Sequence, residues 1–317
     1  MFSLDDLYSA RDIVGAVLPP TAQIHWPLLS QRVGAELFVK HENHNPTGSF
    51  KVRGGLTYLD RLVRERPQVK QLVSATRGNH GQSLAFASAI HGVPVRIFVP
   101  HGNSREKNAA MRAYGAELVE DGTDFEAARQ AAMRNASEPG TEMVPSFHRD
   151  LVVGVSTYAL ELFTSVENID TLYVPIGLGS GISGCILARD LLGLKTSIVG
   201  VQAAGAPSYA RSFAQGRVVE TATANTMADG IATRSPDPEA VRIINAGAAR
   251  IVEISETEIA GAIRAYWSDT HNLAEGSAAA ALAAAIQERA KLAGKRTAVI
   301  LSGSNIDLAT FKKCVLD

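Results

Sequence analysis

The fold is decided around the run His41-Glu42-Asn43-His44-Asn45-Pro46-Thr47-Gly48-Ser49-Phe50-Lys51-Val52-Arg53-Gly54-Gly55. Its first half carries turn and cap residues, which predict that a helix begins near Ser49 or Phe50 with Lys51 in its first turn. The helix macrodipole is positive at that end, so a charged lysine is disfavoured there while a neutral or imine-linked amine is not. A solvated surface lysine is the alternative. The run singles out Lys51 as a candidate for chemistry.

Length and composition indicate a globular protein. The chain has 317 residues, long enough for about two domains, and 46% of them are hydrophobic, enough for a full core. Lysine and arginine number 31 against 32 aspartates and glutamates, so the net charge is -1. This balance indicates neither nucleic acid nor an anionic membrane surface as a partner. A small-molecule substrate is the partner that remains.

The cysteines and the N-terminus predict a cytoplasmic protein. Cys185 and Cys314 are the only cysteines, are far apart and lack metal-like spacing, as expected in a reducing compartment. The first residues, Met1 to Asp6, are acidic rather than basic and do not form a secretory signal. The most apolar stretch, 277–286, is too short to span a bilayer, and its alanines suit close helix packing in a core.

Strand and helix patterns alternate along most of the chain. A helix should begin after Ser3, a strand should cover 36–40, and the Lys51 helix should run to about Pro67. Strands and helices then alternate at 71–74, 82–90, 95–99, 105–114, 116–119 and 125–135, and further strands are expected at 171–175, 197–202, 251–254 and 297–301. This alternation predicts an α/β protein with two interleaved open, mostly parallel sheets, helices on both faces, and ligands at the carboxyl ends of the strands.

A glycine-rich loop follows the strand expected at 171–175. It reads Pro175-Ile176-Gly177-Leu178-Gly179-Ser180-Gly181-Ile182-Ser183-Gly184 and leads into a helix, so its backbone N–H groups can approach a phosphate closely. Gly179, Gly181 and Gly184 also satisfy the dinucleotide pattern G-x-G-x-x-G. A dinucleotide site needs an acidic residue at the end of the next strand, where this chain has Gln202. A dinucleotide-binding oxidoreductase is therefore disfavoured.

Two further loops follow expected strands. The first is Ser74-Ala75-Thr76-Arg77-Gly78-Asn79-His80-Gly81, where backbone N–H groups at the start of a helix can bind a carboxylate. The second is Leu301-Ser302-Gly303-Ser304-Asn305, which by itself is an ordinary strand-to-helix turn. Both loops would lie at the carboxyl edge of a parallel sheet, where ligands bind.

The run 45–54 resembles, without a gap, the cofactor-lysine motif of the fold type II pyridoxal phosphate enzymes, in the branch of threonine dehydratase and serine racemase. The resemblance extends from near Val39 to Asn305. It implies the tryptophan synthase β-like fold, with a large cofactor-binding domain at 1–70 and 148–317 and a small mobile domain at 71–147. Dimers are common in the family, so a homodimer is expected.

The same resemblance gives each loop a role. Lys51 would carry pyridoxal 5'-phosphate as a Schiff base and, once released, act as the catalytic base. Asn79 would contact the phenolic oxygen of the cofactor, and Ser302 its ring nitrogen. The cofactor would also be held by Phe50, Gly177, Leu178, Gly179, Ser180 and Gly181. The substrate would be bound by Thr76, Arg77, Gly78, Asn79 and His80.

Arg77 departs from the family's pattern, because racemases of this family carry a serine there and threonine dehydratases usually a small residue. An arginine does not readily give up a proton, so the second acid or base that racemisation needs is missing. We therefore expect Arg77 to face a second substrate carboxylate, as in 3-hydroxyaspartate. A solvent-facing Arg77, or one paired with a nearby acid, is the alternative.

No metal site is predicted. Racemase-like members bind a divalent cation through two carboxylates after the strand that corresponds to 197–201, where this chain offers Gln202, Ala206 and Ser208. Hard cations need charged oxygen ligands, which these residues do not supply.

These features predict a pyridoxal phosphate-dependent ammonia-lyase, a dehydratase of amino-acid catabolism. It would eliminate water from a β-hydroxy-α-amino acid such as threonine, serine or 3-hydroxyaspartate and yield a 2-oxo acid and ammonia. Three alternatives stay open: an amino-acid racemase of the same family, a dinucleotide-binding oxidoreductase, and a pyridoxal phosphate carrier without turnover.

Overall fold

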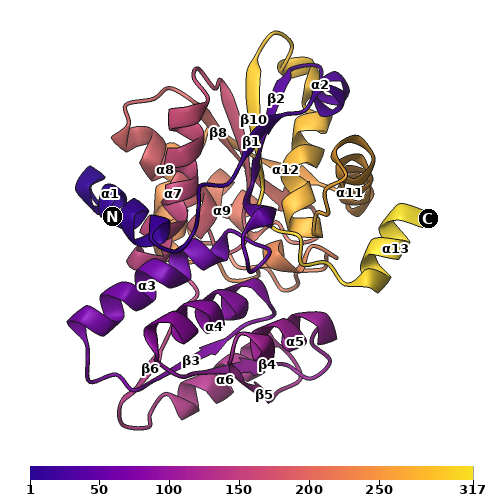
Figure 1. Ribbon diagram of the computed structural model, residues 1–317. Coiled ribbons are helices and arrows are strands. Elements are labelled where there is room, and N and C mark those ends of the chain that lie inside the picture. The colour runs from indigo at the N-terminus through magenta and orange to yellow at the C-terminus, as the bar shows by residue number, and fades with distance from the viewer. Residues whose placement is uncertain (317) are drawn as a thin grey trace.

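The protein, described here by a computed structural model over residues 1–316, folds around two sheets (Figure 1). The strands are β1 (Gln23–His25), β2 (Glu36–His41), β3 (Gln71–Ala75), β4 (Val95–Val99), β5 (Glu117–Glu120), β6 (Thr141–Met143), β7 (Thr171–Pro175), β8 (Ser197–Ala203), β9 (Arg250–Ile254) and β10 (Arg296–Leu301). The α-helices are α1 (Leu4–Gly15), α2 (Pro27–Val33), α3 (Lys51–Glu65), α4 (Asn79–His91), α5 (Arg105–Ala113), α6 (Phe125–Asn135), α7 (Arg149–Ser165), α8 (Ser180–Leu191), α9 (Ser208–Gln215), α10 (Pro238–Gly247), α11 (Glu256–Thr270), α12 (Gly276–Gln287) and α13 (Leu308–Leu316). Three 3-10 turns are η1 (Glu42–His44), η2 (Asp229–Ile231) and η3 (Arg289–Lys291).

The larger sheet has the order β1-β2-β10-β7-β8-β9, and the smaller has the order β5-β4-β3-β6. Only the β1–β2 pair is antiparallel in the described chain. Strands β2 and β10 end level with each other, because Leu301 pairs with His41. The predicted fold class, with two mostly parallel sheets, is therefore confirmed, and the chain segments that follow β2 and β10 leave the sheet side by side.

Both faces of the larger sheet are buried, as parallel sheets require. Along β10, Ala298 and Ile300 belong to a core shared with α1, α7, α8 and α10. Val299 and Leu301, on the opposite face, belong to a core shared with α2, α11 and α12. Helix α12 is the alanine-rich helix that was expected to pack closely, and its residues 276–285 are all buried.

The smaller sheet uses only strands between Gln71 and Met143 (the lower part of Figure 1). Helices α3, α4 and α5 share a core on one of its faces, and α6 covers the other. Helix α3 packs closely on α4, because a Cβ at Gly55 would lie 2.3 Å from Ser83 Oγ. These strands lie within the predicted small domain 71–147, whose boundaries and mobility stay a prediction.

Most element boundaries lie within a residue or two of those predicted. Helix α1 begins after Ser3, whose side chain forms a capping box with Asp6. Helix α4 begins at Asn79, earlier than the predicted 82, because the polar residues of its first turn carry no apolar periodicity. The short edge strands β1 and β6, of three residues each, were not predicted. Within residues 1–316, no helix is long and apolar enough to cross a membrane.

Candidate functional site

Lys51 opens helix α3, with Phe50 at the N-cap. Its Nζ donates to Ser180 Oγ at 2.9 Å and lies 4.9 Å from the centroid of the Phe50 ring. Its backbone carbonyl accepts from Ser83 Oγ at 2.6 Å, which ties the start of α3 to α4. Burial lowers the pKa of Lys51 to about 8. The amine is therefore more easily deprotonated than that of an exposed lysine, as a base or a nucleophile requires.

The glycine loop between β7 and α8 holds Lys51's partner, Ser180. Gly179 is the N-cap of α8 with a φ of 93°, which favours glycine, and a Cβ there would lie 2.6 Å from the Ala240 Cβ. At Gly177, an added Cβ would lie 2.2 Å from the carbonyl oxygen of Gly230. In the described chain no side chain caps α8. Its first N–H groups form the kind of helix start that binds phosphate.

The loop at 76–80 contains a hydrogen bond of its own. Thr76 Oγ1 accepts from the Gly78 N–H at 3.0 Å, so this N–H is already used, and the helix start of α4 that remains for a carboxylate begins at Asn79. His80 is kept neutral, because burial and then the nearby Lys51 charge lower its pKa to about 3. Thr76 therefore shapes this loop, and its contact with substrate stays a prediction.

Asn79 is fixed from both sides by residues that lie far away in the sequence. Its Nδ2 donates to Glu275 Oε1 at 2.8 Å, and its Oδ1 accepts from Asn305 Nδ2 at 2.8 Å. Glu275 is 3% exposed, and burial raises its pKa to about 7 although the charge of Lys107 opposes this. The small-sheet loop thus meets two segments of the larger body of the protein.

The turn after β10 is joined to the turn before Lys51. The Phe50 N–H donates to the Ser302 carbonyl at 3.0 Å, and the Ser304 N–H donates to the Gly48 carbonyl at 2.9 Å. An isolated bridge pairs Ser49 with Gly303. Ser302 is buried and sits beside the start of α3. The level ends of β2 and β10 therefore bring Lys51 and Ser302 together, although 250 positions separate them in the sequence.

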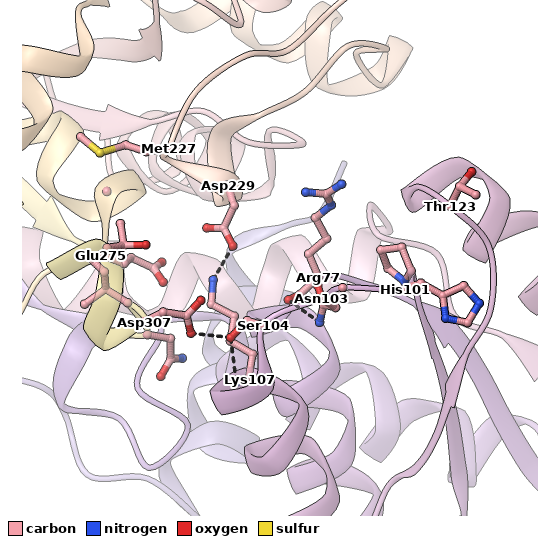
Figure 2. Close-up of a pocket in the computed structure, with 16 residues that line it drawn as sticks. Arg77, His101, Asn103, Ser104, Lys107, Thr123, Met227, Asp229, Glu275 and Asp307 are labelled. Atoms are coloured by element: carbon pink, nitrogen blue, oxygen red, sulfur yellow. Dashed lines mark hydrogen bonds and ion pairs between the residues drawn. The ribbon is translucent and has the colours of Figure 1, made fainter. Parts of the chain in front are cut away.

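A cavity of about 240 Å³ lies next to this site, lined by Glu275 and Asn305, which hold Asn79, but not by Lys51, Ser180 or Ser302. Figure 2 shows its polar lining, in which Lys107 of α5 forms an ion pair with Asp229, and Ser104 donates to Asp307. The stem of Lys107 packs on Gly78, where a Cβ would lie 2.6 Å from Lys107 Cδ. Sequence patterns did not single out Lys107 or Asp229, because neither belongs to a motif.

Arg77 also lines this cavity, and its side chain extends into it in Figure 2. Within residues 1–316 its guanidinium forms no hydrogen bond and no ion pair, so the predicted alternative of a pairing with a nearby acid is not observed there. The three carboxylates of the lining each have a donor: Lys107 for Asp229, Ser104 for Asp307, and Asn79 for Glu275. Arg77 is exposed, as the solvent-facing alternative expected, and it is the arginine or lysine of the lining that has no ion-pair partner within residues 1–316.

The residues around Lys51 fit a bound phosphorylated cofactor. Several buried polar atoms in these segments have no partner within the described chain, which is the state that a polar ligand relieves. They are Ser49 Oγ, His80 Nε2, Ser183 Oγ, Glu275 Oε2 and Ser277 Oγ. The Lys51 amine, the helix start of α8 and Ser302 converge on the same region. No group of three or more potential metal ligands is found among residues 1–316.

Comparison with known proteins agrees with this geometry. A family described as "Pyridoxal-phosphate dependent enzyme" matches residues 17–303. The chain is 36% identical to an L-threonine ammonia-lyase of Geobacter sulfurreducens, over 93% of this chain and 73% of that protein. It is 29% identical to an L-threo-3-hydroxyaspartate ammonia-lyase of Saccharomyces cerevisiae, over 96% of this chain and 94% of that protein. The structure of maize serine racemase superposes with a TM-score of 0.92 at 26% identity, covering 98% of this chain and 96% of that one.

Proposed function

Because this chain belongs to the family of pyridoxal-phosphate dependent enzymes, we propose that Lys51 is the residue that carries its cofactor and catalyses the elimination of water from a β-hydroxy-α-amino acid. The cofactor is pyridoxal 5'-phosphate, as predicted, and the predicted class, an ammonia-lyase of the dehydratase type, is confirmed. The substrate of this particular chain and the roles of its residues are the proposal that follows.

The observation that carries the proposal is the 2.9 Å contact from Lys51 Nζ to Ser180 Oγ. It puts the one candidate amine against the helix start that would hold the cofactor phosphate. When bound, pyridoxal phosphate withdraws electrons from Cα of the substrate. Lys51 would take the Cα proton, and the first turn of α4 would hold the α-carboxylate. Loss of the β-hydroxyl with a proton gives water and an enamine, and its hydrolysis gives the 2-oxo acid and ammonia.

The test is ammonia release from a panel of β-hydroxy amino acids, with alanine as a substrate analogue that has no leaving group. We expect ammonia and an equal amount of 2-oxo acid from at least one member of the panel. Chiral analysis of the recovered substrate runs in parallel, because several similar proteins are racemases. If both enantiomers of the substrate are recovered and no ammonia is released, the enzyme is a racemase and the proposed elimination is wrong.

We propose further that the preferred substrate carries a second carboxylate, as 3-hydroxyaspartate does. Arg77 is adjacent to the helix start of α4, lines the cavity, and is an exposed cation without an ion-pair partner among the described residues. A charge-assisted bond to a carboxylate is the interaction that such a guanidinium lacks. One relative at 29% identity and another at 31% are named L-threo-3-hydroxyaspartate ammonia-lyases.

Replacing Arg77 by alanine should lower kcat/KM for 3-hydroxyaspartate by about 10- to 100-fold, the effect of one lost bond between charged groups. The value for threonine should change by less than about threefold, because threonine has no second carboxylate for Arg77 to bind. Steady-state ammonia release from both substrates measures the difference.

Arg105 provides the matched control. It is an exposed arginine on the neighbouring helix α5 and does not line the cavity. Arg105→Ala should leave the preference between the two substrates unchanged. If Arg77→Ala lowers kcat/KM equally for both substrates, or for neither, Arg77 does not bind a second carboxylate.

Two properties predicted from the sequence stay proposals: the homodimer and the cytoplasmic location. Light scattering of the purified protein tests the first, and fractionation of the source cells tests the second.

A further inference from the structure

We propose that Asn305 is a positioning residue that fixes which way the Asn79 amide faces the cofactor. The side-chain amide of Asn305 joins three segments of the site. Its Nδ2 donates to the Thr47 carbonyl at 2.9 Å and to Asn79 Oδ1 at 2.8 Å. Its Oδ1 lies 2.7 Å from where a Cβ would stand on Gly48, whose φ is 65°. The lysine turn, the small-sheet loop and the turn after β10 therefore meet at one side chain.

The Asn79 amide is hydrogen-bonded to a donor on one side and to an acceptor on the other. Asn305 occupies its oxygen, and Glu275 Oε1 accepts one of its two Nδ2 hydrogens at 2.8 Å. The second Nδ2 hydrogen remains as the group that can face a ligand. If the amide were turned over, its oxygen would face Glu275 and the ligand instead. Asn305 is thus the donor that, together with Glu275 as the acceptor, fixes whether the cofactor meets a donor or an acceptor at this position.

A donor is the group that the cofactor needs here. The proposal rests on the role of Asn79 toward the phenolic oxygen of pyridoxal phosphate, which is part of the proposed function. A hydrogen bond from Nδ2 favours the ionised form of that oxygen, whereas an amide oxygen favours the protonated form. The visible absorption of the bound cofactor distinguishes these two forms, so the amide orientation can be read without substrate.

Asn305→Asp tests this most directly, because it keeps the shape of the side chain and replaces its donor by an acceptor. The aspartate should turn the Asn79 amide over, so that its Nδ2 faces residue 305. We expect the ratio of the ionised to the protonated band to fall by about tenfold relative to the wild-type holoenzyme at the same pH, the effect of one lost bond to a charged oxygen. Asn305→Ala removes the donor without adding charge and should shift the ratio in the same direction by less.

A double-mutant cycle separates positioning from a direct effect of the new charge. In an Asn79→Ala background, Asn305→Asp should no longer change the spectrum, because the amide that it turns is gone. A shift of the same size in that background would show that the aspartate acts on the cofactor directly, and would overturn the proposal. If the Asn305→Asp variant does not bind the cofactor, the same cycle is run with Asn305→Ala. The proposal then requires that Asn305→Ala shifts the spectrum in the wild-type background and not in the Asn79→Ala background.

Asn272 supplies an isosteric control. It is partly buried and bonded to Asn43 and His44, and it belongs to neither the cavity lining nor the Lys51 contacts. Asn272→Asp should leave the cofactor spectrum as in the wild type. A spectral shift in Asn272→Asp as large as that in Asn305→Asp would also refute the positioning role of Asn305. A chain that shows the Asn305 effect and yet releases no ammonia would contradict the proposed elimination alone, because the spectrum is recorded without substrate.

Discussion

Replacing Lys51 by alanine is expected to lower ammonia release by at least about 10,000-fold, because the change removes both the covalent attachment of the cofactor and the base. A second readout does not depend on turnover. Borohydride reduction of the holoenzyme followed by peptide mass spectrometry should find the cofactor on Lys51 in the wild type and on no lysine in the variant. Lys51→Arg should fail equally, because a guanidinium does not readily form an imine.

Lys107 is a poor substitute for Lys51. Lys107 is the lysine that lines the adjacent cavity, but its ammonium is paired with Asp229. Burial lowers the pKa of Lys107, but the nearby carboxylates of Asp229, Glu275 and Asp307 together outweigh burial and raise it. Lys295 is exposed and remote from the site, so Lys295→Ala is the control that should keep full activity. Turnover or covalent cofactor that survives in Lys51→Ala would remove Lys51 from the mechanism.

The second large effect is expected on stability, at the buried ion network behind the lysine turn. Arg53 and Glu42 are both fully buried, and Arg53 Nε donates to Glu42 Oε2 at 2.7 Å. The same guanidinium donates to Glu161 Oε1 at 2.6 Å, and Lys40 Nζ donates to Glu161 Oε2 at 2.6 Å. Asn45 Nδ2 also donates to Glu42 Oε2 at 2.8 Å. This network holds the turn that leads into α3, and therefore holds Lys51.

Replacing Arg53 by methionine should lower the free energy of unfolding by about 3 to 5 kcal/mol, because it leaves a buried carboxylate without its partner. Urea denaturation followed by circular dichroism measures the change. Arg242→Met is the matched control, because Arg242 forms a similar pair with Glu239 on the exposed surface of α10. That pair should contribute less than about 1 kcal/mol. Equal losses in the two variants would contradict the importance of burial.

Acid should reduce the difference between the wild type and Arg53→Met. Burial raises the pKa of Glu42, but the charges of Arg53 and Lys40 outweigh it, so this pKa lies below its ordinary value of 4.5. A carboxylate with a lowered pKa in the folded state stabilises the protein fully above its unfolded-state pKa and loses that contribution as pH falls through the folded value. The advantage of the wild type should therefore be constant near neutral pH and shrink below pH 4.5. A constant advantage down to the acid transition would argue against the charged pair.

The sequence alone determined the parts of this protein that depend on neighbouring residues. The turn and cap residues before Lys51 predicted the start of α3, and the apolar patterns predicted most strands of both sheets, because each follows from local backbone preference and from periodicity. The glycine loop and the Asn79 loop were also found, since each is a continuous run. The resemblance to a family then placed these separate runs in one site.

Only the tertiary structure decided which distant groups meet. The pairing of Arg53 with Glu161, of Lys107 with Asp229, and of Asn79 with Glu275 and Asn305 joins residues that are far apart along the chain. No local pattern encodes such contacts, because they arise when strands β2 and β10 end level and the smaller sheet closes on the larger body. The orientation of the Asn79 amide is likewise a property of that packing, because it depends on Glu275 and Asn305 rather than on its neighbours in sequence.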